Sequence, residues 1–283
     1  MSLINAIIFG IVEGLTEFLP VSSNANVRIV GALLGADPGV AFTAIIQLGA
    51  GLAMVVYFWP DIVRIVSAWF RSLFGRAPRN HPDARLGWFI IIGSIPVVVV
   101  GLLFQDAIET TLRSLWIIAG TLIGFGILLG IADLIGAKRR RMKELTFGHA
   151  IVIGLAQALA IIPGVSRSGG TITAGLFLGY ERRDAFKYSF LLAIPVVVGS
   201  GLYQLYKGIE EPCVDTAVAI CSAQQIGVTE TVVATVISFI VGLAAVTVFM
   251  RYITRHSFLP FVIYRILLGG ALVVMLSTGV LEA

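Results

Sequence analysis

The sequence predicts an all-α polytopic membrane protein with six transmembrane helices and two re-entrant helical hairpins of opposite orientation. Of its 283 residues, 58% are hydrophobic and 13% are charged, against about 25% charged in an ordinary soluble domain. Several apolar runs reach the length needed to cross a bilayer. The segments between these runs alternate between basic and acidic, as loops on opposite sides of a membrane do. We expect a single membrane domain, residues 1–283.

Six apolar runs are each predicted to cross the membrane once. They are residues 39–59, 86–104, 115–132, 188–206, 231–250 and 258–281. The segments after the first, third and fifth runs are basic, and those after the second and fourth lean acidic. The basic segment after the first run, residues 60–85, is predicted to be a loop. The positive-inside rule places the basic loops in the cytoplasm and the acidic loops and both termini outside. Because the basic residues fall in such short clusters, the net charge of +4 indicates no nucleic-acid partner.

The first predicted hairpin, residues 3–34, contains charged residues within an apolar stretch. Glu13 and Glu17 are four residues apart and so share one face of a helix. Pro20 then ends this helix, and Ser22 and Ser23 are natural N-caps of a second one. Each apolar half is too short to cross a bilayer, which favours a helix–break–helix unit that enters and leaves on the same side.

Two carboxylates in an apolar setting need a bound proton, a cation or a basic partner, because repulsion and desolvation both act against them. The free N–H groups at the start of the second helix suit an anion such as phosphate. The carboxylates suit a hard divalent cation. The alternative is that Glu13 and Glu17 lie on a solvated helix face, as such pairs do in soluble proteins. The apolar flanks favour the functional interpretation.

The second predicted hairpin, residues 148–180, has the same layout with different polar residues. Its break contains Arg167 between Ser166 and Ser168, after Pro163 and before a pair of glycines. Glycine-rich backbone can hold an anion, and a guanidinium group matches phosphate oxygens in two places. The alternative is a kink whose arginine reaches the lipid headgroups. Basic segments on both sides of this hairpin predict that it enters from the cytoplasm.

The two hairpins are predicted to form an inverted repeat. A constant offset of 144 residues relates positions of the same or similar type in both. The pairs are Gly10 and Gly154, Glu13 and Gln157, Val21 and Val165, and Ser22 and Ser166. If both breaks reach the middle of the membrane, their carboxylates, hydroxyls and arginine meet there. Such a set of groups suits phosphoryl transfer.

At these motifs the chain resembles the undecaprenyl-diphosphate phosphatase family, also called bacitracin-resistance proteins. The similarity covers nearly the whole chain and rests on four motifs. They are Glu-Gly-Leu-Thr-Glu-Phe-Leu-Pro-Val-Ser-Ser at 13–23, Pro-Gly-Val-Ser-Arg-Ser-Gly at 163–169, Ser-Phe-Leu-Leu-Ala-Ile-Pro at 189–195 and Phe-Val-Ile-Tyr-Arg at 261–265. The resemblance implies a phosphoric anhydride hydrolase of the bacterial plasma membrane that converts undecaprenyl diphosphate to undecaprenyl phosphate. This reaction recycles the lipid carrier for peptidoglycan synthesis and confers bacitracin resistance.

The resemblance also implies a site that faces the outer side, a divalent cation (Mg²⁺ or Ca²⁺) and roles for named residues. Glu13 and Glu17 would bind the metal or act as acid and base. Ser23 would be the nucleophile or orient a water, and Arg167 would bind the diphosphate. Further candidates for substrate contact are Ser22, Asn26, Gln47, Ser166, Ser168 and Arg265.

The first motif departs from the family at Asn26, where a histidine taken as catalytic usually stands. Asparagine can hydrogen-bond a phosphate but cannot accept a proton near neutral pH. Either a glutamate is then the base, or the protein is a slow or inactive paralogue whose turnover Asn26→His should raise. The alternative function is a polyprenyl-phosphate binding or transport protein, which the broken helices of an inverted repeat suggest.

Cys213 and Cys221 share a predicted outer loop, where a disulfide and two free thiols fit equally well. The preferred prenyl chain length, the choice of metal and the formation of a homodimer stay open. The N-terminus lacks a basic segment before its apolar run, so we expect no cleavable signal peptide.

Overall fold

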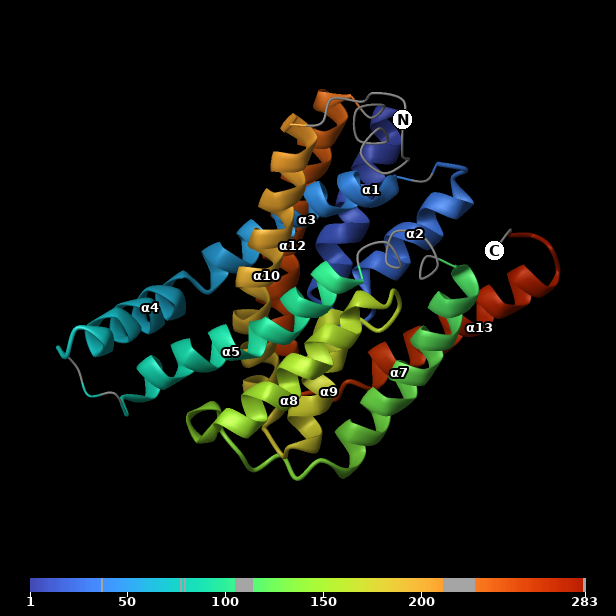
Figure 1. Cartoon of the computed structure of the whole chain (residues 1–283). Helices are drawn as coiled ribbons and strands as arrows, with labels where there is room; N and C mark the ends of the chain where they lie inside the picture. The colour runs from blue at the N-terminus through green and yellow to red at the C-terminus, as the bar shows by residue number, and fades with distance from the viewer. Residues whose placement is uncertain (37, 77, 79, 105–113, 211–226, 282–283) are drawn as a thin grey trace.

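The computed structural model (Figure 1) describes the chain except residues 37, 77, 79, 105–113, 211–226 and 282–283. Within the described residues every regular element is a helix, as the sequence predicts. The helices are α1 Leu3–Glu17, α2 Ser23–Leu33, α3 Gly39–Tyr57, α4 Trp59–Leu73, α5 Pro82–Leu103, α7 Leu115–Ile135, α8 Phe147–Ala158, α9 Arg167–Phe177, α10 Arg182–Glu210, α12 Val228–Ile253 and α13 Leu259–Ser277. Short 3-10 turns, η2 Met142–Glu144 and η3 Leu159–Ile161, precede and follow α8. Cys213 and Cys221, for which the sequence leaves a disulfide and two free thiols open, lie outside the described residues.

Several helices have the length and apolar character of membrane spans. Among the described residues, five of them, α5, α7, α10, α12 and α13, are long and apolar enough to cross a bilayer. The helices α3 and α4 are bent by 74° relative to each other and add a sixth span if the pair counts as one. The chain is therefore a multi-pass membrane protein, and five or six candidate spans stand where the sequence predicts six.

The predicted loop at 60–85 is wrong over its first half, because Trp59–Leu73 forms helix α4. Its charges suggested a loop, but they are spaced as on one helix face. Asp61 and Arg64, one turn apart, form an ion pair 2.9 Å long. Apolar side chains such as Phe70 are exposed on the same helix. A helix with a polar and an apolar face can lie along a membrane surface, which explains why it is both charged and helical.

The two helix–break–helix units follow the predicted offset. The first helices begin at Leu3 and Phe147, and the second helices begin at Ser23 and Arg167, each pair 144 residues apart. The packing is reciprocal as well. Helix α1 of the first unit lies against α12 in the second half of the chain, and α8 of the second unit lies against α5 in the first half. This exchange of partners is what an internal repeat with interlocked halves produces.

Glycines allow α1 and α12 to approach closely. A Cβ atom on Gly10 would lie 2.5 Å from the Ala234 carbonyl oxygen, and one on Gly14 would lie 2.7 Å from the Ser238 carbonyl oxygen. Small residues at helix crossings are the usual means of close packing in membrane proteins. Because the contacts advance by four residues on both helices, α1 runs parallel to α12, and the two helices start at the same end of the molecule.

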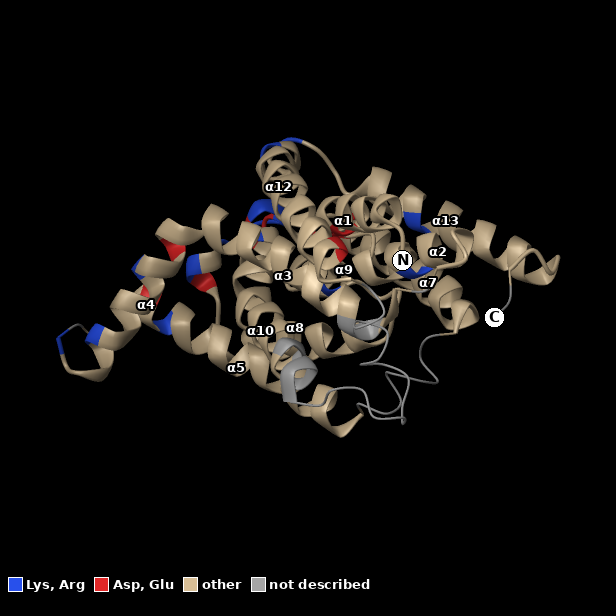
Figure 2. Ribbon diagram, turned by 90° about the horizontal axis from the view of Figure 1, so that it is seen from above, with Lys and Arg blue, Asp and Glu red and all other residues tan. Residues whose placement is uncertain are grey.

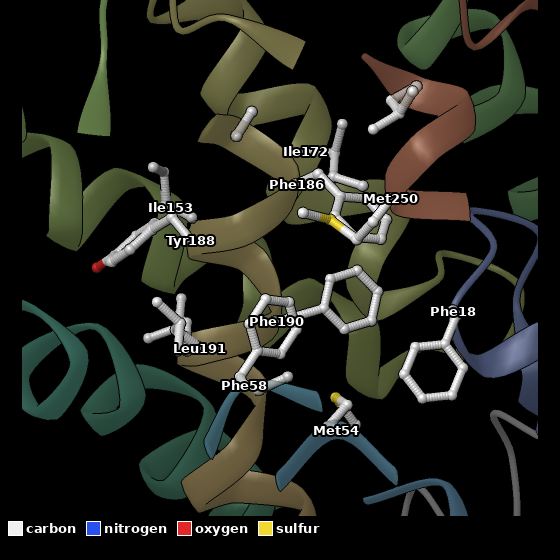
Figure 3. Packing of buried hydrophobic residues seen from close by; sticks show 14 of the residues in the cluster. Phe18, Met54, Phe58, Ile153, Ile172, Phe186, Tyr188, Phe190, Leu191 and Met250 are labelled. Atoms are coloured by element: carbon white, nitrogen blue, oxygen red, sulfur yellow. The ribbon is translucent and has the colours of Figure 1, made fainter. Parts of the chain in front are cut away.

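The largest cluster of buried apolar side chains surrounds α10 (Figure 3). Phe190 of α10 stacks on Phe18, which directly follows Glu17, with the ring centroids 5.6 Å apart. The centroid of Phe186 lies 4.3 Å from that of Phe190 and 5.0 Å from that of Phe249 in α12. These contacts fix the end of α1 against helices from the second half of the chain, and so they hold Glu17 in position.

The segments predicted to be cytoplasmic meet at one end of the molecule. Asp133, near the end of α7, forms a 2.6 Å ion pair with Arg182 at the start of α10 and accepts a hydrogen bond from the N–H of Phe258. Lys187 of α10 pairs with Asp61 of α4 at 2.7 Å. In Figure 2, basic and acidic residues gather on and beside α4. The basic segments that the sequence assigns to one side of the membrane thus share one side of the protein.

Candidate active site

The first break is a tight turn between α1 and α2, at the point where Pro20 ends the first helix. Ser22 has a left-handed backbone with φ of 68°, which is uncommon for a residue with a Cβ atom and is found where neighbouring structure enforces it. Helix α2 then starts at Ser23. This geometry turns the Ser23 hydroxyl back toward Glu17 at the end of α1.

The second break repeats this backbone conformation. Ser166 has φ of 70°, and its Oγ accepts a hydrogen bond of 3.0 Å from a backbone N–H in the first turn of α9. Gly164 has φ of 91°, and Thr121 of α7 donates to the neighbouring carbonyl of Pro163 at 2.7 Å. Ser22 and Ser166 are related by the offset of 144, so both halves of the chain use the same strained serine.

The two breaks enclose a cavity of about 170 Å³. Seven of the residues predicted from the sequence line it: Glu17, Ser22, Ser23, Gln47, Ser166, Arg167 and Ser168. Three polar residues that were not predicted also line it: Asn24, Gln157 and Ser200. The remaining wall is apolar and comes mainly from α5, η3 and α10. One polar and one apolar wall suit a lipid that carries phosphate groups.

Glu17 is the centre of the hydrogen bonds in this cavity. Ser23 Oγ donates to Glu17 Oε2 at 2.5 Å, and Gln47 Nε2 donates to the same oxygen at 3.3 Å. The other oxygen, Oε1, forms an ion pair with the guanidinium group of Arg167. Both carboxylate oxygens are therefore engaged. A hydroxyl bonded to a carboxylate that is itself oriented by further groups is the geometry of an activated nucleophile.

Glu13 is fully buried one turn before Glu17 and is not among the residues that line the cavity. Neither of its carboxylate oxygens has a hydrogen-bond partner within the described chain. Gln157, its counterpart in the second unit, is also fully buried and unpartnered among the described residues. Buried polar atoms without partners require an explanation, such as an ion or a water.

Glu13 and Glu17 differ in how well they would suit a divalent cation shared with a substrate. Mg²⁺ commonly takes one or two carboxylates and completes its shell with waters and phosphate oxygens. Glu13 has unpartnered oxygens for such an ion, whereas Glu17 is held by Arg167. Across the residues that the structure describes, no three His, Cys, Asp or Glu side chains gather in a group that could hold a metal. If such an ion binds, the described side chains would supply only part of its coordination shell.

Comparison with known proteins identifies the family of this chain. The family model of bacitracin resistance protein BacA matches residues 6–271. The chain belongs to this family. It is 55% identical over 285 residues to the undecaprenyl-diphosphatase of Paenarthrobacter aurescens, with all of both chains covered. It is 54% identical to the undecaprenyl-diphosphatase of Pseudarthrobacter chlorophenolicus, with 98% of each covered. Undecaprenyl-diphosphatase 2 of Agrobacterium fabrum is 53% identical, over 97% of this chain and 95% of the relative.

Asn26, at the position where we expect the BacA family to carry histidine, does not line the cavity. Its Nδ2 donates to the carbonyls of Val21 at 3.1 Å and Ser22 at 2.8 Å. Its Oδ1 accepts a hydrogen bond from the hydroxyl of Tyr264 in α13. The amide thus ties the first break to α13, and these surroundings do not support its predicted contact with the substrate.

Arg265, in another motif that this chain shares with the family, is fully buried in α13 and also lies outside the cavity lining. Its Nη1 donates to the Pro20 carbonyl at 3.1 Å, in the first break. Its Nη2 donates to the carbonyls of Gly164 at 2.7 Å and Val165 at 3.0 Å, in the second break. Its Nε donates to the Leu122 carbonyl in α7 at 3.3 Å. The guanidinium group joins the two breaks, so a substrate contact is not supported for Arg265 either.

Proposed function

We propose that this protein hydrolyses undecaprenyl diphosphate to undecaprenyl phosphate and inorganic phosphate in the bacterial plasma membrane. The reaction recycles the lipid carrier of peptidoglycan synthesis. The three relatives, 53%, 54% and 55% identical, are named undecaprenyl-diphosphatases. The observation that carries the proposal is the 2.5 Å hydrogen bond from Ser23 to Glu17, in a cavity that also contains Arg167. A hydroxyl, a base and a cation together are what transfer of a phosphoryl group requires.

Ser23 is the proposed nucleophile, and Glu17 is the proposed base. Ser23 Oγ attacks the terminal phosphorus while its proton passes to Glu17. The bond from that phosphorus to the bridging oxygen breaks, and its electron pair leaves on undecaprenyl phosphate. Water then cleaves the phosphoserine, which releases inorganic phosphate and restores the hydroxyl. Arg167 is paired with Glu17 in this structure. When substrate binds, its guanidinium group can bond to the phosphate oxygens instead and neutralise their charge, while Glu17 accepts the proton.

A divalent cation, Mg²⁺ or Ca²⁺, belongs to this proposal. Glu13 would hold it, because both of its oxygens are buried without a partner among the described residues. When bound, the ion would offset the negative charge of the phosphates. Chelation with EDTA should lower phosphate release, and Glu13→Gln should remove the response to added cation.

The membrane arrangement is part of the same proposal. We place six spans across the bilayer, with α1–α2 and α8–α9 as re-entrant hairpins that enter from opposite sides, and the active site open to the outer side. The parallel course of α1 and α12 and the reciprocal packing of α8 on α5 support this arrangement. Helices of this kind also occur in transporters, so a polyprenyl-phosphate binding or transport protein is the alternative.

Phosphate release from a short-chain polyprenyl diphosphate by purified protein tests the proposal. Ser23→Ala and Glu17→Gln should each lower kcat by about a hundredfold to ten-thousandfold, the usual contribution of a nucleophile–base pair. Ser200→Ala is the matched control, because this hydroxyl lines the same cavity but bonds to the Val197 carbonyl. Its kcat should stay near that of the wild type.

Two further results decide between the versions of the proposal. Acid quenching with a substrate radiolabelled on the terminal phosphate should trap a phosphoserine in the wild type. A wild-type protein that turns over without such an adduct would make Ser23 a group that orients water. If the wild type binds the lipid but releases no phosphate, the binding or transport function takes its place.

A further inference from the structure

A second cavity lies away from the active site, between the end of α3, the start of α10 and the end of α12. Its volume is about 700 Å³. Four residues with basic side chains line it: Arg183, Arg251, Arg255 and His256. Within the described chain, no Asp or Glu side chain lines this cavity. Its remaining wall includes two tyrosines and the apolar side chains of Val248 and Met250.

The three arginines of this cavity differ from two basic residues beside them, Arg182 and Lys187. Arg182 and Lys187, close to Arg183 in sequence, each form an ion pair with an aspartate. In the part of the chain that the structure describes, Arg183, Arg251 and Arg255 form no ion pair with a carboxylate. Like charges gathered at one cavity repel each other, and an anion between them would remove that repulsion.

Beside these charges, the side chains of the cavity wall contact one another. The ring of His256 stacks on Tyr252 with the centroids 4.4 Å apart, and His256 Nδ1 donates to the Tyr252 carbonyl at 3.0 Å. Val248, on the next turn of α12 toward the membrane, is 67% exposed. The cavity therefore joins a cationic end to an apolar helix surface. A molecule with an anionic head and an apolar tail matches both parts.

We propose that this cavity binds the phosphate group of an anionic phospholipid. Arginine forks bind phosphate oxygens in pairs, and the start of α10, where Arg183 lies, adds the positive end of a helix dipole. Basic pockets between helices at the cytoplasmic surface are a known way to hold lipid headgroups. Tyrosines are typical of the membrane interface. Which leaflet supplies the lipid depends on the membrane orientation given under the proposed function. The lipid site itself does not depend on the proposed hydrolysis.

The test measures how much each added ligand raises the unfolding temperature of the full chain in neutral detergent. The ligands are phosphatidylglycerol, phosphatidylcholine, glycerol phosphate and inorganic phosphate. We expect a rise with phosphatidylglycerol that exceeds the rise with phosphatidylcholine. The double variant Arg251→Gln/Arg255→Gln should bind phosphatidylglycerol about 25-fold more weakly, since each arginine near an anionic headgroup contributes roughly a factor of five.

The control is the charge-matched double variant Arg71→Gln/Arg76→Gln, which removes two exposed arginines outside this cavity. It should keep wild-type affinity. Equal losses in both double variants, or equal responses to the two phospholipids, would overturn the proposal. A comparable rise with glycerol phosphate or inorganic phosphate would support the phosphate site but assign it to a soluble ligand. If the double variant does not fold, Arg255→Gln alone should show about a fivefold loss. Phosphate release from the polyprenyl diphosphate by the Arg251→Gln/Arg255→Gln protein should equal that of the wild type. A failure of the lipid site can therefore be told apart from a failure of the proposed function.

Discussion

Arg265 illustrates how a charged residue can serve the site without touching the substrate. Its guanidinium group is fully buried, and its donors reach carbonyls in both breaks. A break in a membrane helix exposes carbonyls that cannot be left without donors in an apolar interior. The planar fork of arginine can satisfy carbonyls in several directions at once, which a lysine ammonium cannot do over the same span.

Arg265→Lys should therefore lower both stability and turnover. Each buried carbonyl that loses its donor costs about 1–3 kcal/mol, so the unfolding temperature in detergent should fall by several degrees. Because Arg265 does not line the cavity, kcat should fall more than KM rises. Arg76→Lys, at an exposed position, is the control and should leave unfolding and turnover unchanged. A stable Arg265→Lys protein with normal kcat and a raised KM would instead make this residue a direct substrate contact.

Asn26 leads to a prediction that differs from the one the sequence alone supports. From the sequence, Asn26→His should raise turnover by restoring a base. In the structure Glu17 already accepts the hydrogen bond of Ser23, and the Asn26 amide is occupied by two carbonyls and by Tyr264. We therefore expect Asn26→His to give far less than the hundredfold to ten-thousandfold gain typical of a general base.

Steady-state kinetics and thermal unfolding separate these roles of Asn26. Asn26→Ala should destabilise the protein by about 1–3 kcal/mol, because the carbonyls of Val21 and Ser22 and the hydroxyl of Tyr264 each lose a hydrogen bond. Tyr264→Phe removes one of these bonds and serves as the reference for a double-mutant cycle, in which the two losses should not add. A large rise in kcat for Asn26→His would show that the imidazole reaches the substrate and would restore the earlier interpretation.

At the scale of elements, the sequence was sufficient to locate both breaks. Pro20 and Pro163 within apolar runs predict them, and the offset of 144 predicts that they correspond. The sequence was not sufficient to identify α4, because charged residues after an apolar run are typical of a loop as well as of a helix on the membrane surface. The offset relates Gln157 to Glu13, but it does not predict that Gln157 lines the cavity. Which side chains face a cavity depends on how helices pack, and packing is decided by contacts far apart in the chain.

The reciprocal packing of α1 on α12 and α8 on α5 gives a prediction at this scale. Gly154 of α8 lies directly against the backbone of Gly93 in α5, so Gly154→Ala would force the two helices apart. Such overpacking typically costs about 1–3 kcal/mol, which thermal unfolding in detergent would detect. Gly124→Ala is the matched control, since a Cβ atom there has open space around it. A Gly154→Ala protein as stable as the control would mean that the crossing is loose.

At the scale of the whole molecule, the alternation of loop charge and the ion pairs agree on one arrangement. The ion pairs of Asp133 with Arg182 and of Asp61 with Lys187 bring α4, α7 and α10 together at one end. The start of α8 is tied to the same end, because Arg85 of α5 donates to the Leu145 carbonyl just before it. The start of α1 lies at the other end, since α1 runs parallel to α12, whose last residues are basic.

This arrangement predicts that the two hairpins are labelled from opposite sides of the membrane. Single cysteines are placed at exposed positions in a Cys213→Ser/Cys221→Ser background: Ile4→Cys and Val228→Cys at one end, and Phe147→Cys and Arg255→Cys at the other. An impermeant thiol reagent should modify the first pair in intact cells, since the starts of α1 and α12 are placed outside. The second pair should react only after permeabilisation, because the positive-inside rule holds their basic neighbours in the cytoplasm. Phosphate release by each variant checks that the fold is kept.

If Ile4→Cys and Phe147→Cys react from the same side, the hairpins are not inverted. If all four positions exchange sides, the repeat stands but the active site opens to the cytoplasm.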